Sequence, residues 1–585
     1  MSRRLSVRRA AIAVAVGTGL AIAGPAVTAT AAPPSADFTG LRSYLVISAP
    51  NDTAAAKKGV TDNNGTVYTS YDAIGVVVAH SASATFAADV RKVAGVQQVG
   101  ATRTSDLPSQ VNNPPIPPSP TQNPSNVAET VRWDMAQIGA DKAWAVNPGS
   151  ASVTVGVLDT GVDDKHADLA ANFDASKSGS CAYGKLDIRE GSWRDTGTHG
   201  THVAGTIAAT KNNKGMVGVA TGVKIASVRV AENPSGLFFA ENTVCAFVFA
   251  GDKGFKVTNN SYYTDPWLFN CPSDPDQAAI VEGVKRATAY AEGKGVLHVA
   301  AAGNENYDLA NKTTDTTSPN DSTPVSRQIT NDCVDVPAEL PGVVTVAAVG
   351  DQDRKSGYSN FGADKIDIAA PGGDSAQDTG VYSTVPGGGY GNKNGTSMAS
   401  PHVAGVAALL ASTNPDATPA QLAEKLAVQA NDLACPSGDS RCTGTAARNS
   451  FYGEGQADAL EAVSGTTPPP SKFFESTDNV NIPDAGATVT SSLGVTGITG
   501  SAPATLKVGV DIKHTYRGDL VIDLVAPDGT AYRLKNASSG DSVDNVITTY
   551  TVNASAETAA GTWKLRVQDV YRADTGYVDA WNLSF

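Results

Sequence analysis

Apolar and amphipathic runs alternate along the central part of the chain, residues 127–463. The continuously apolar runs, which predict strands, are residues 153–158, 224–230, 295–301 and 343–349. The amphipathic runs, which predict helices, are residues 201–209, 241–250, 277–291 and 398–412. Strands that are apolar throughout and alternate with helices form a parallel sheet covered on both faces. The pattern therefore predicts a doubly wound α/β domain whose ligands bind beyond the carboxyl ends of the strands.

Proline-rich stretches flank this domain, and we interpret residues 108–126 and 464–471 as extended linkers. Before the first linker, residues 37–107 carry strand signals and a helical run that are typical of a small α+β module; these are residues 44–47, 74–79 and 84–93. After the second linker, residues 472–585 alternate apolar and polar side chains in runs separated by turns, which predicts an antiparallel β-sandwich.

The first 31 residues have the pattern of a secretory signal. Four arginines precede an apolar run over residues 10–23, and Ala29-Thr30-Ala31 supplies the small residues that a signal peptidase needs. We therefore predict a signal peptide at residues 1–31 and a secreted, extracellular protein. A membrane anchor is the alternative, but an apolar run of about 14 residues is shorter than the roughly 20 that span a bilayer.

The composition narrows the class of partner. With 41% hydrophobic residues the chain can bury a core, and its formal net charge is −14. Nucleic acids and anionic membranes attract basic surfaces, so we expect neither as a main partner.

Six cysteines follow the signal, enough for three disulfides in an exported protein. Six cysteines allow 15 pairings. We favour a pair between Cys435 and Cys442, because these residues bracket a Pro-Ser-Gly-Asp-Ser turn. Free buried thiols are the alternative.

Three short segments each place a residue type used in nucleophilic catalysis beside small residues. Asp159 ends an apolar run in Val-Leu-Asp-Thr-Gly, where an ordinary turn or capping aspartate is the alternative. His199 and His202 stand three apart at a predicted helix start, where a zinc pair or a packed core histidine is the alternative. The zinc-protease pattern, however, needs a Glu after the first His and a second His four positions on. Ser397 stands at a predicted helix start in Gly-Thr-Ser-Met-Ala-Ser-Pro-His, where it is well placed to attack a carbonyl carbon. A plain N-cap serine is the alternative.

Together these segments resemble the three active-site signatures of the subtilisin-like serine proteases, in that family's order Asp, His, Ser. A fourth segment, Ala-Ala-Ala-Gly-Asn-Glu, resembles the family segment whose asparagine, here Asn304, binds the oxyanion. The resemblance spans about residues 130–460 and implies the subtilisin fold. It also implies acyl transfer, with Ser397 as nucleophile, His199 as general base and Asp159 as the residue that orients His199.

The flanking parts resemble known companions of such proteases. Residues 37–107 are similar to the inhibitory propeptide of subtilisins, which implies cleavage between Ser105 and Asn126. Residues 472–585 resemble the P domain of kexin- and furin-like convertases, which implies a β-sandwich. A carbohydrate-binding role for this part is the alternative, through aromatic residues such as Tyr516, Trp563 and Trp581, although core packing explains them more simply.

The segment that binds the substrate backbone in this family departs from the usual pattern. It reads Ser261-Tyr262-Tyr263, with a tyrosine where the family has glycine, which implies a different pocket for the residue before the scissile bond. Asp335 stands close to where the family forms the floor of that pocket, and an acidic floor favours Lys or Arg. A solvated loop aspartate beside Cys333 is the alternative.

Calcium is the metal that the resemblance implies, because subtilisins commonly carry it and it needs only oxygen ligands. Asp168 and Asn212 match two family ligands, and Glu129 takes the N-terminal place. An oxygen-rich loop without metal is the alternative. We expect structural calcium and no organic cofactor.

The sequence thus predicts a secreted serine endopeptidase made as a self-processing zymogen. Its expected partners are peptide and protein substrates and its own propeptide as inhibitor, and we expect a monomer. The rival interpretation is a catalytically silent binding or scaffold protein on the same fold. Asp159, His199, Ser397 and Asn304 are all present, which favours the enzyme.

Overall fold

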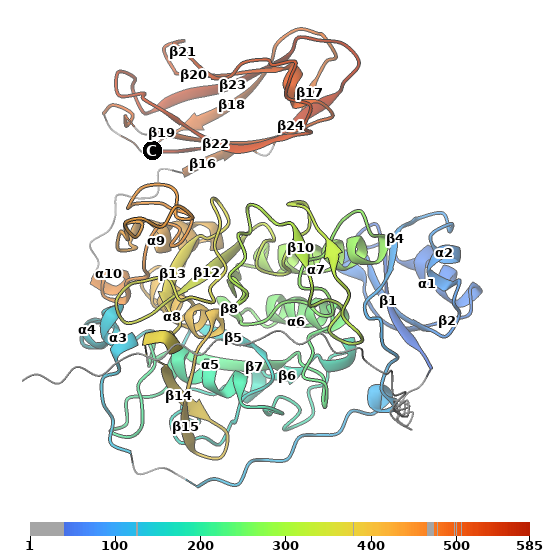
Figure 1. The fold of residues 1–585 in the computed structure, drawn as a ribbon, viewed down its shortest axis with the longest axis vertical. Coiled ribbons are helices and arrows are strands. Elements are labelled where there is room, and N and C mark those ends of the chain that lie inside the picture. Colours follow the sequence, from blue (N-terminus) through green and yellow to red (C-terminus); the bar gives the residue numbers. More distant parts are fainter. Residues whose placement is uncertain are drawn as a thin grey trace, which may run out of the picture.

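The computed structural model describes residues 40–123, 127–377, 380–464, 473–476, 478–496, 498, 500–504 and 506–585. Figure 1 shows the whole chain coloured along the sequence. The predicted signal peptide and most of the second linker lie outside the described residues. Within those residues, no helix has the length and apolar character needed to cross a membrane.

The N-terminal module is a four-stranded antiparallel sheet in the order β2-β3-β1-β4 with two short helices. Its elements are β1 (Arg42–Ser48), α1 (Ala54–Asp62), β2 (Gly65–Tyr71), β3 (Val76–Ser81), α2 (Phe86–Val90) and β4 (Val96–Ala101). The strand expected from residue 74 begins at Val76, because Gly75 turns the chain with φ 70°. Alternate residues of β1 face opposite sides, so Tyr44 and Val46 pack on the module's own helices while Leu45 packs on the central domain.

The central domain is built on a seven-stranded parallel sheet in the order β13-β12-β9-β8-β5-β7-β6. Its strands are β5 (Thr154–Asp159), β6 (Gly179–Ser180), β7 (Lys224–Arg229), β8 (Val257–Asn260), β9 (Leu297–Ala301), β12 (Val343–Val349) and β13 (Ile368–Pro371). Short antiparallel pairs lie outside it: β10 (Thr314–Asp315) with β11 (Arg327–Gln328), and β14 (Val381–Val385) with β15 (Gly389–Lys393).

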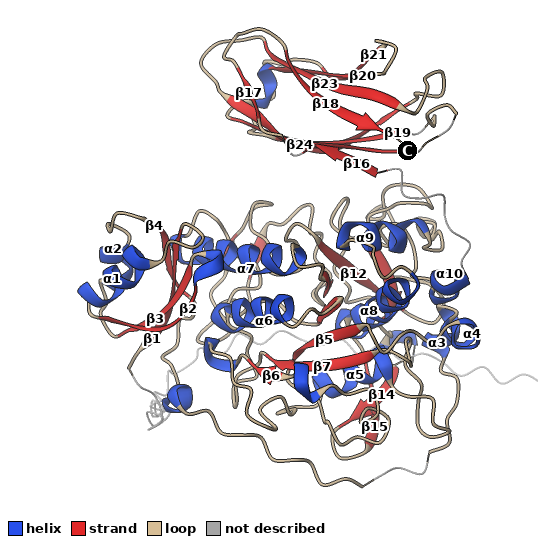
Figure 2. Ribbon diagram, turned by 180° about the vertical axis from the view of Figure 1, so that it is seen from behind, coloured by secondary structure: helices blue, strands red, loops and turns tan. Residues whose placement is uncertain are grey.

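Helices cover both faces of this sheet (Figure 2). On one face lie α6 (Ala240–Asp252) and α7 (Pro275–Glu292), which share a core with Leu158 of β5. On the other lie α5 (His199–Ala208) and α8 (Thr396–Thr413), which pack on Val155 and Val157. The remaining helices are α3 (Trp133–Gln137), α4 (Ala140–Val146), α9 (Pro419–Val428) and α10 (Ala459–Ser464). The doubly wound α/β architecture predicted from the alternating runs is confirmed.

The C-terminal part is the predicted antiparallel β-sandwich. One sheet joins β16 (Phe473–Ser476), β17 (Val480–Ile482), β19 (Leu506–His514), β22 (Val546–Val552) and β24 (Gly576–Ser584). The other joins β18 (Val489–Val495), β20 (Leu520–Val525), β21 (Ala531–Lys535) and β23 (Gly561–Asp569). Trp563 and Trp581 are 0% and 1% exposed and lie in the core between the sheets. These two tryptophans therefore present no surface to a carbohydrate.

Three disulfides join the six cysteines: Cys181 with Cys245, Cys271 with Cys333, and Cys435 with Cys442. The third is the pair favoured from the sequence. The first two close loops of 64 and 62 residues, which no local turn signals.

The first linker follows the surface of the central domain. The carbonyl of Pro114 accepts a hydrogen bond from Arg189, and the side chain of Gln122 donates one to Asp163 at 2.9 Å. Figure 1 shows this segment passing around the edge of the domain (blue). The linker that follows the N-terminal module is thus hydrogen-bonded to the surface of the central domain.

Candidate active site

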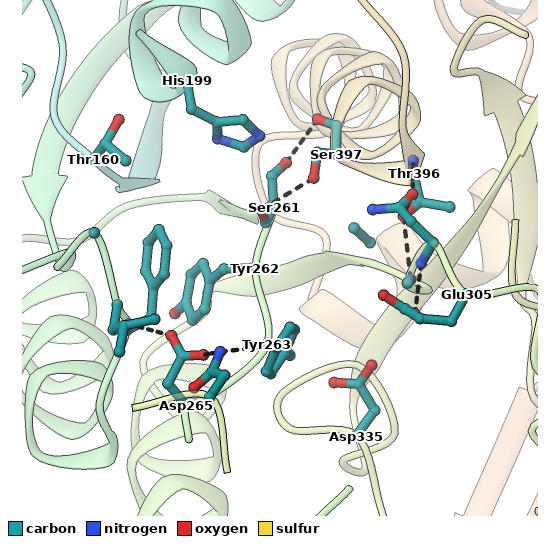
Figure 3. Close-up of a pocket in the computed structure, with 17 residues that line it drawn as sticks. Thr160, His199, Ser261, Tyr262, Tyr263, Asp265, Glu305, Asp335, Thr396 and Ser397 are labelled. Atoms are coloured by element: carbon teal, nitrogen blue, oxygen red, sulfur yellow. Dashed lines mark hydrogen bonds between the residues drawn. The ribbon is translucent and has the colours of Figure 1, made fainter. Parts of the chain in front are cut away.

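The candidate site lies at the carboxyl edge of the central sheet (Figure 3). Asp159 is the last residue of β5, Ser261 follows directly after β8, and Asn304 lies three residues beyond β9. Because these parallel strands are neighbours, the three residues meet at one edge. The first turns of α5 and α8 bring His199 and Ser397 to the same place. All but the buried Asp159 border a cavity of about 400 Å³.

Asp159 is fully buried and holds His199. Its Oδ1 lies 2.8 Å from His199 Nδ1 and also accepts the N–H of Thr160 at 2.7 Å. Burial lowers the pKa of His199, but the negative charge and hydrogen bond of Asp159 raise it by more, so that the pKa lies above its usual 6.5. With its Nδ1 proton held by Asp159, the imidazole keeps Nε2 as a proton acceptor.

A glycine allows this pair to form. A Cβ at Gly200 would lie 2.1 Å from the carbonyl oxygen of Gly161 and 3.1 Å from the Cβ of Asp159. Only a residue without a side chain lets α5 begin directly against the end of β5. The glycine that follows His199 therefore sets the distance between the histidine and the aspartate.

Ser397 lies in the first turn of α8 and faces the cavity (Figure 3). Its Oγ donates a hydrogen bond to the carbonyl of Ser261 at 3.2 Å, and Ser261 Oγ donates to the carbonyl of Ser397 at 2.9 Å. The start of a helix carries partial positive charge, which suits a residue where an oxyanion would form. The two serines fasten the start of α8 to the end of β8.

The side-chain amide of Asn304 has a fixed orientation. Its Oδ1 accepts hydrogen bonds from Thr396, from the backbone N–H at 2.8 Å and from Oγ1 at 3.0 Å. An amide oxygen that is held in this way leaves the Nδ2 hydrogens available. A Cβ placed on Gly395 would be 3.5 Å from Asn304 Oδ1, 3.6 Å from the Ser397 nitrogen and 3.7 Å from Asn304 Nδ2, so the Asn304 amide lies beside the start of α8.

Two tyrosines line the cavity beyond Ser261. The ring of Tyr262 stacks on Phe238 with centroids 4.5 Å apart, and Tyr263 accepts a hydrogen bond from Asn320 at 2.8 Å. Burial raises the pKa of both phenols, so both stay neutral. Tyr263, which replaces the family glycine, thus forms part of the cavity wall.

Asp335 also lines the cavity and is only 1% exposed, so it is not a solvated loop residue. Its Oδ1 has no hydrogen-bond partner among the described residues, and burial raises the pKa of this carboxyl well above its usual range. Glu305 and Asp265 border the same cavity, and burial raises the pKa of Asp265 to about 6. Asp265 stands in no motif, so its place at the cavity is a finding of the structure.

The other two histidines of the motif segments make structural contacts. His202 Nε2 bonds to the carbonyls of Val381 and Gly391, and burial lowers its pKa to about 3. His402 Nε2 lies 3.1 Å from Asp134 in a fully buried pair. Neither residue borders the cavity.

The calcium candidates lie together in the structure. Asp168 is fully buried, and its carboxylate accepts hydrogen bonds from Asn212 Nδ2 at 2.9 Å and from the Tyr390 hydroxyl at 2.7 Å. Glu129 accepts the backbone N–H groups of Asn212 and Asn213. No group of three or more His, Cys, Asp or Glu side chains in the described part of the chain is arranged to hold a metal. The Asp168 carboxylate and the side-chain oxygen of Asn212 are nevertheless the kinds of ligand that calcium takes.

Comparisons with known proteins identify the family of this chain. The subtilase family model matches residues 150–455, and the proprotein convertase P-domain model matches residues 503–585. Subtilisin DY of Bacillus licheniformis is 33% identical over 306 residues, which are 52% of this chain and 93% of that protein. Leupeptin-inactivating enzyme 1 of Streptomyces exfoliatus is 57% identical over 122 residues, 21% of this chain and 28% of that protein. The chain therefore covers less than a third of this second relative.

A solved structure gives the same fold. The epidermin leader peptide processing serine protease of Staphylococcus aureus matches with a TM-score of 0.57 and 23% identity, covering 73% of this chain and 99% of that one. The family model spans more than half of the sequence, and the match to subtilisin DY spans nearly all of that protein. This chain belongs to the subtilase family of serine peptidases and carries a C-terminal proprotein convertase P-domain.

Proposed function

We propose that this protein is a secreted serine endopeptidase that works through an acyl-enzyme and is made as a self-processing precursor. The observation that carries the proposal is the hydrogen bond of His199 to Asp159 beside Ser397 and Asn304, at one cavity. The rival, a catalytically silent scaffold, needs none of these four residues to converge.

In this mechanism, Ser397 Oγ attacks the substrate carbonyl while His199 Nε2 takes its proton, and the Asp159 carboxylate stabilises the imidazolium. His199 then gives the proton to the leaving amine. In the second half of the reaction water attacks the acyl-enzyme while His199 takes its proton, and His199 returns the proton to Ser397 Oγ as the acid leaves. Rotation of the Ser397 side chain exchanges its bond to the Ser261 carbonyl for one to His199. The Asn304 amide and the Ser397 N–H bind the oxyanion.

We further propose that the residue before the scissile bond is Lys or Arg. Asp335 supports this, because it is a buried carboxylate at the cavity wall whose Oδ1 has no hydrogen-bond partner among the described residues. A cationic side chain would supply the missing donors and favour the ionised form of the carboxyl. Tyr262 and Tyr263 would contact the same part of the substrate.

The remaining parts serve production and stability in this proposal. Residues 1–31 act as the signal, 37–107 as the inhibitory propeptide with linker 108–126, and 127–463 as the protease, followed by linker 464–471 and the P domain at 472–585. The disulfides support an extracellular, oxidising location. Asp168 and Asn212 would hold a calcium ion, which would tie the loop after α5 to the domain.

The test compares the wild-type precursor with Ser397→Ala. The wild type should shorten by self-cleavage, hydrolyse casein and be labelled at Ser397 by a fluorophosphonate, whereas the variant should stay full length and inactive. Matching thermal unfolding of the two would show that the variant is folded. If both are processed and both hydrolyse casein, Ser397 is not the nucleophile.

A further inference from the structure

Residues 114–123 of the first linker are held on the central domain, although their composition is that of a spacer. Five of the seven residues 114–120 are proline. Proline fixes φ at about −65°, so a proline-rich segment loses little conformational entropy when it is held in place. Both ends of the segment are bonded to the central domain, and the prolines between them border a cavity of about 310 Å³ on its surface. The segment therefore has contacts that a free spacer does not need.

The first end of the segment is attached beside Arg189. Nη2 of this arginine donates to the Pro114 carbonyl at 2.9 Å and to the Asp187 carboxylate at 2.6 Å. Ile116 lies against Gly191, where an added Cβ would be 3.3 Å from the Ile116 side chain. Asp187 thus orients the arginine that receives the linker.

The second end of the segment supplies a donor to a buried carboxylate. Asp163 is 0% exposed, and Gln122 Nε2 donates to its two oxygens at 2.9 and 3.2 Å. The backbone N–H groups of Lys165 and Gly387 donate to the same carboxylate at 3.0 and 2.9 Å. The next residue of the linker, Asn123, donates its N–H to the Gly387 carbonyl at 2.7 Å. A carboxylate that is removed from water depends on each of its donors, so Asp163 would be under-satisfied without Gln122.

The linker end contacts two parts of the domain that support α5, the helix that begins with the proposed general base. Asp163 lies four residues after Asp159, and its N–H donates to Thr201 Oγ1 in α5 at 3.0 Å. Gly387 lies in the turn between β14 and β15. This hairpin holds α5 through Ser383 Oγ, which donates to a carbonyl of the helix at 2.7 Å. Loss of the linker would therefore loosen the surroundings of the proposed catalytic pair.

The prolines also restrict where the precursor is cut. A substrate backbone that adds to a strand of the protease pairs through its N–H groups, and proline has none. Residues 114–120 are therefore a poor substrate. On their C-terminal side, Gln122 and Asn123 are held by the contacts described above. On their N-terminal side, Ser109, Asn112 and Asn113 are exposed, so the chain is open to attack there.

We propose that the cut that releases the N-terminal module leaves a new N-terminus within residues 106–113, and that residues 114–123 stay bound to the matured protease as an arm that stabilises the start of α5. The cut is the hydrolysis of one peptide bond, in which the oxygen of water enters the new carboxylate and a proton goes to the new amino group. The inference rests on the proposed self-processing of the precursor and specifies where it happens.

The test is self-processing of the purified wild-type precursor, followed by N-terminal sequencing and intact mass measurement of the product. The new N-terminus should lie within residues 106–113, so that the product contains the arm. A product that begins at residue 114 or later overturns the proposal, and this result needs no variant to fold. The Ser397→Ala precursor, incubated in parallel, should stay uncut, which excludes cleavage by a contaminating protease.

Two variants of the full-length precursor then test whether the arm stays bound. Gln122→Ala removes a donor to a buried carboxylate and should lower the unfolding midpoint of the matured enzyme by about 2–5 °C. Ser119→Ala changes an exposed side chain of the same segment and serves as the matched control, which should keep the wild-type midpoint. If matured Gln122→Ala unfolds at the wild-type temperature, the arm is not bound and the proposal is wrong.

The arm and the proposed function fail differently. An enzyme that cleaves casein and is labelled at Ser397, but begins at residue 114 or later, leaves the proposed function standing and overturns the arm. A chain that hydrolyses no casein and is not labelled at Ser397 overturns both, because no self-cleavage then creates the arm.

Discussion

Adding a single methyl group at Gly200 should separate the proposed catalytic pair. A Cβ there would lie 2.1 Å from the carbonyl oxygen of Gly161, whereas such contacts are essentially never shorter than 3.0 Å, so the start of α5 must move by at least about 0.9 Å. The His199–Asp159 contact, now 2.8 Å, would then exceed hydrogen-bonding distance. A misplacement of this size costs about 100-fold in rate, or roughly 2.7 kcal/mol of transition-state stabilisation.

The assay measures kcat/KM against pH and the thermal unfolding midpoint for wild type, Gly200→Ala and the control Gly197→Ala. A Cβ at Gly197 would have no neighbour closer than 3.7 Å, so this variant should behave as the wild type. Without a clash, Ala in place of a helical Gly stabilises a protein by about 0.5–1 kcal/mol. A Gly200→Ala enzyme with full activity and a raised midpoint would therefore refute the packing argument.

Three further changes probe the site. Only neutral His199 accepts a proton and Asp159 raises its pKa, so the acid side of the kcat/KM–pH profile should fall at a pH above 6.5. Asp159→Asn should move this fall to lower pH and reduce kcat by about 10⁴. If the fall does not move, it reports the titration of another group. Asp335→Asn should reduce the preference for Arg over Leu before the scissile bond by about 10- to 100-fold. In the wild type the preference should weaken at acid pH, because the raised pKa of Asp335 makes its carboxyl neutral there. A peptide panel that is cut best after Leu or Phe contradicts this. Calcium at 100 times its Kd would add about 2.7 kcal/mol to the free energy of unfolding, so chelation should lower the unfolding midpoint of the wild type but not that of Asp168→Asn. An unchanged wild-type midpoint would exclude a structural calcium.

Elements with an unbroken apolar pattern could be read from the sequence closely. The strand expected at residues 343–349 has the same bounds as β12, and the helix expected at 277–291 lies within α7. By contrast, the apolar pattern does not predict β8, because three of its four residues are polar although all are buried. Asn260 donates to the Val299 carbonyl and Thr258 bonds to His298, so their burial depends on partners on a neighbouring strand. A local pattern carries no record of such partners.

The site residues also differ in whether a local sequence pattern predicts them. Asp159, His199, Ser397 and Asn304 stand in short motifs, so the sequence could name them before any geometry existed. The buried contact of Arg103 with two glutamates has no motif, because Arg103 is 129 residues from Glu232 and 138 from Glu241. Contacts over such separations follow from how domains dock, which composition and periodicity do not encode.

The disulfide between Cys181 and Cys245 makes the surroundings of Glu241, which contacts Arg103, depend on the redox environment. Cys245 lies one helical turn after Glu241 in α6, and Cys181 precedes Gly184, where an added Cβ would lie 2.7 Å from the Glu241 side chain. Closing a loop of 64 residues stabilises the folded state by about 4 kcal/mol. In a reducing compartment the chain lacks this contribution, although Arg103 still contacts Glu241. Oxidation of this cysteine pair would therefore stabilise the part of the central domain that binds Arg103 of the N-terminal module.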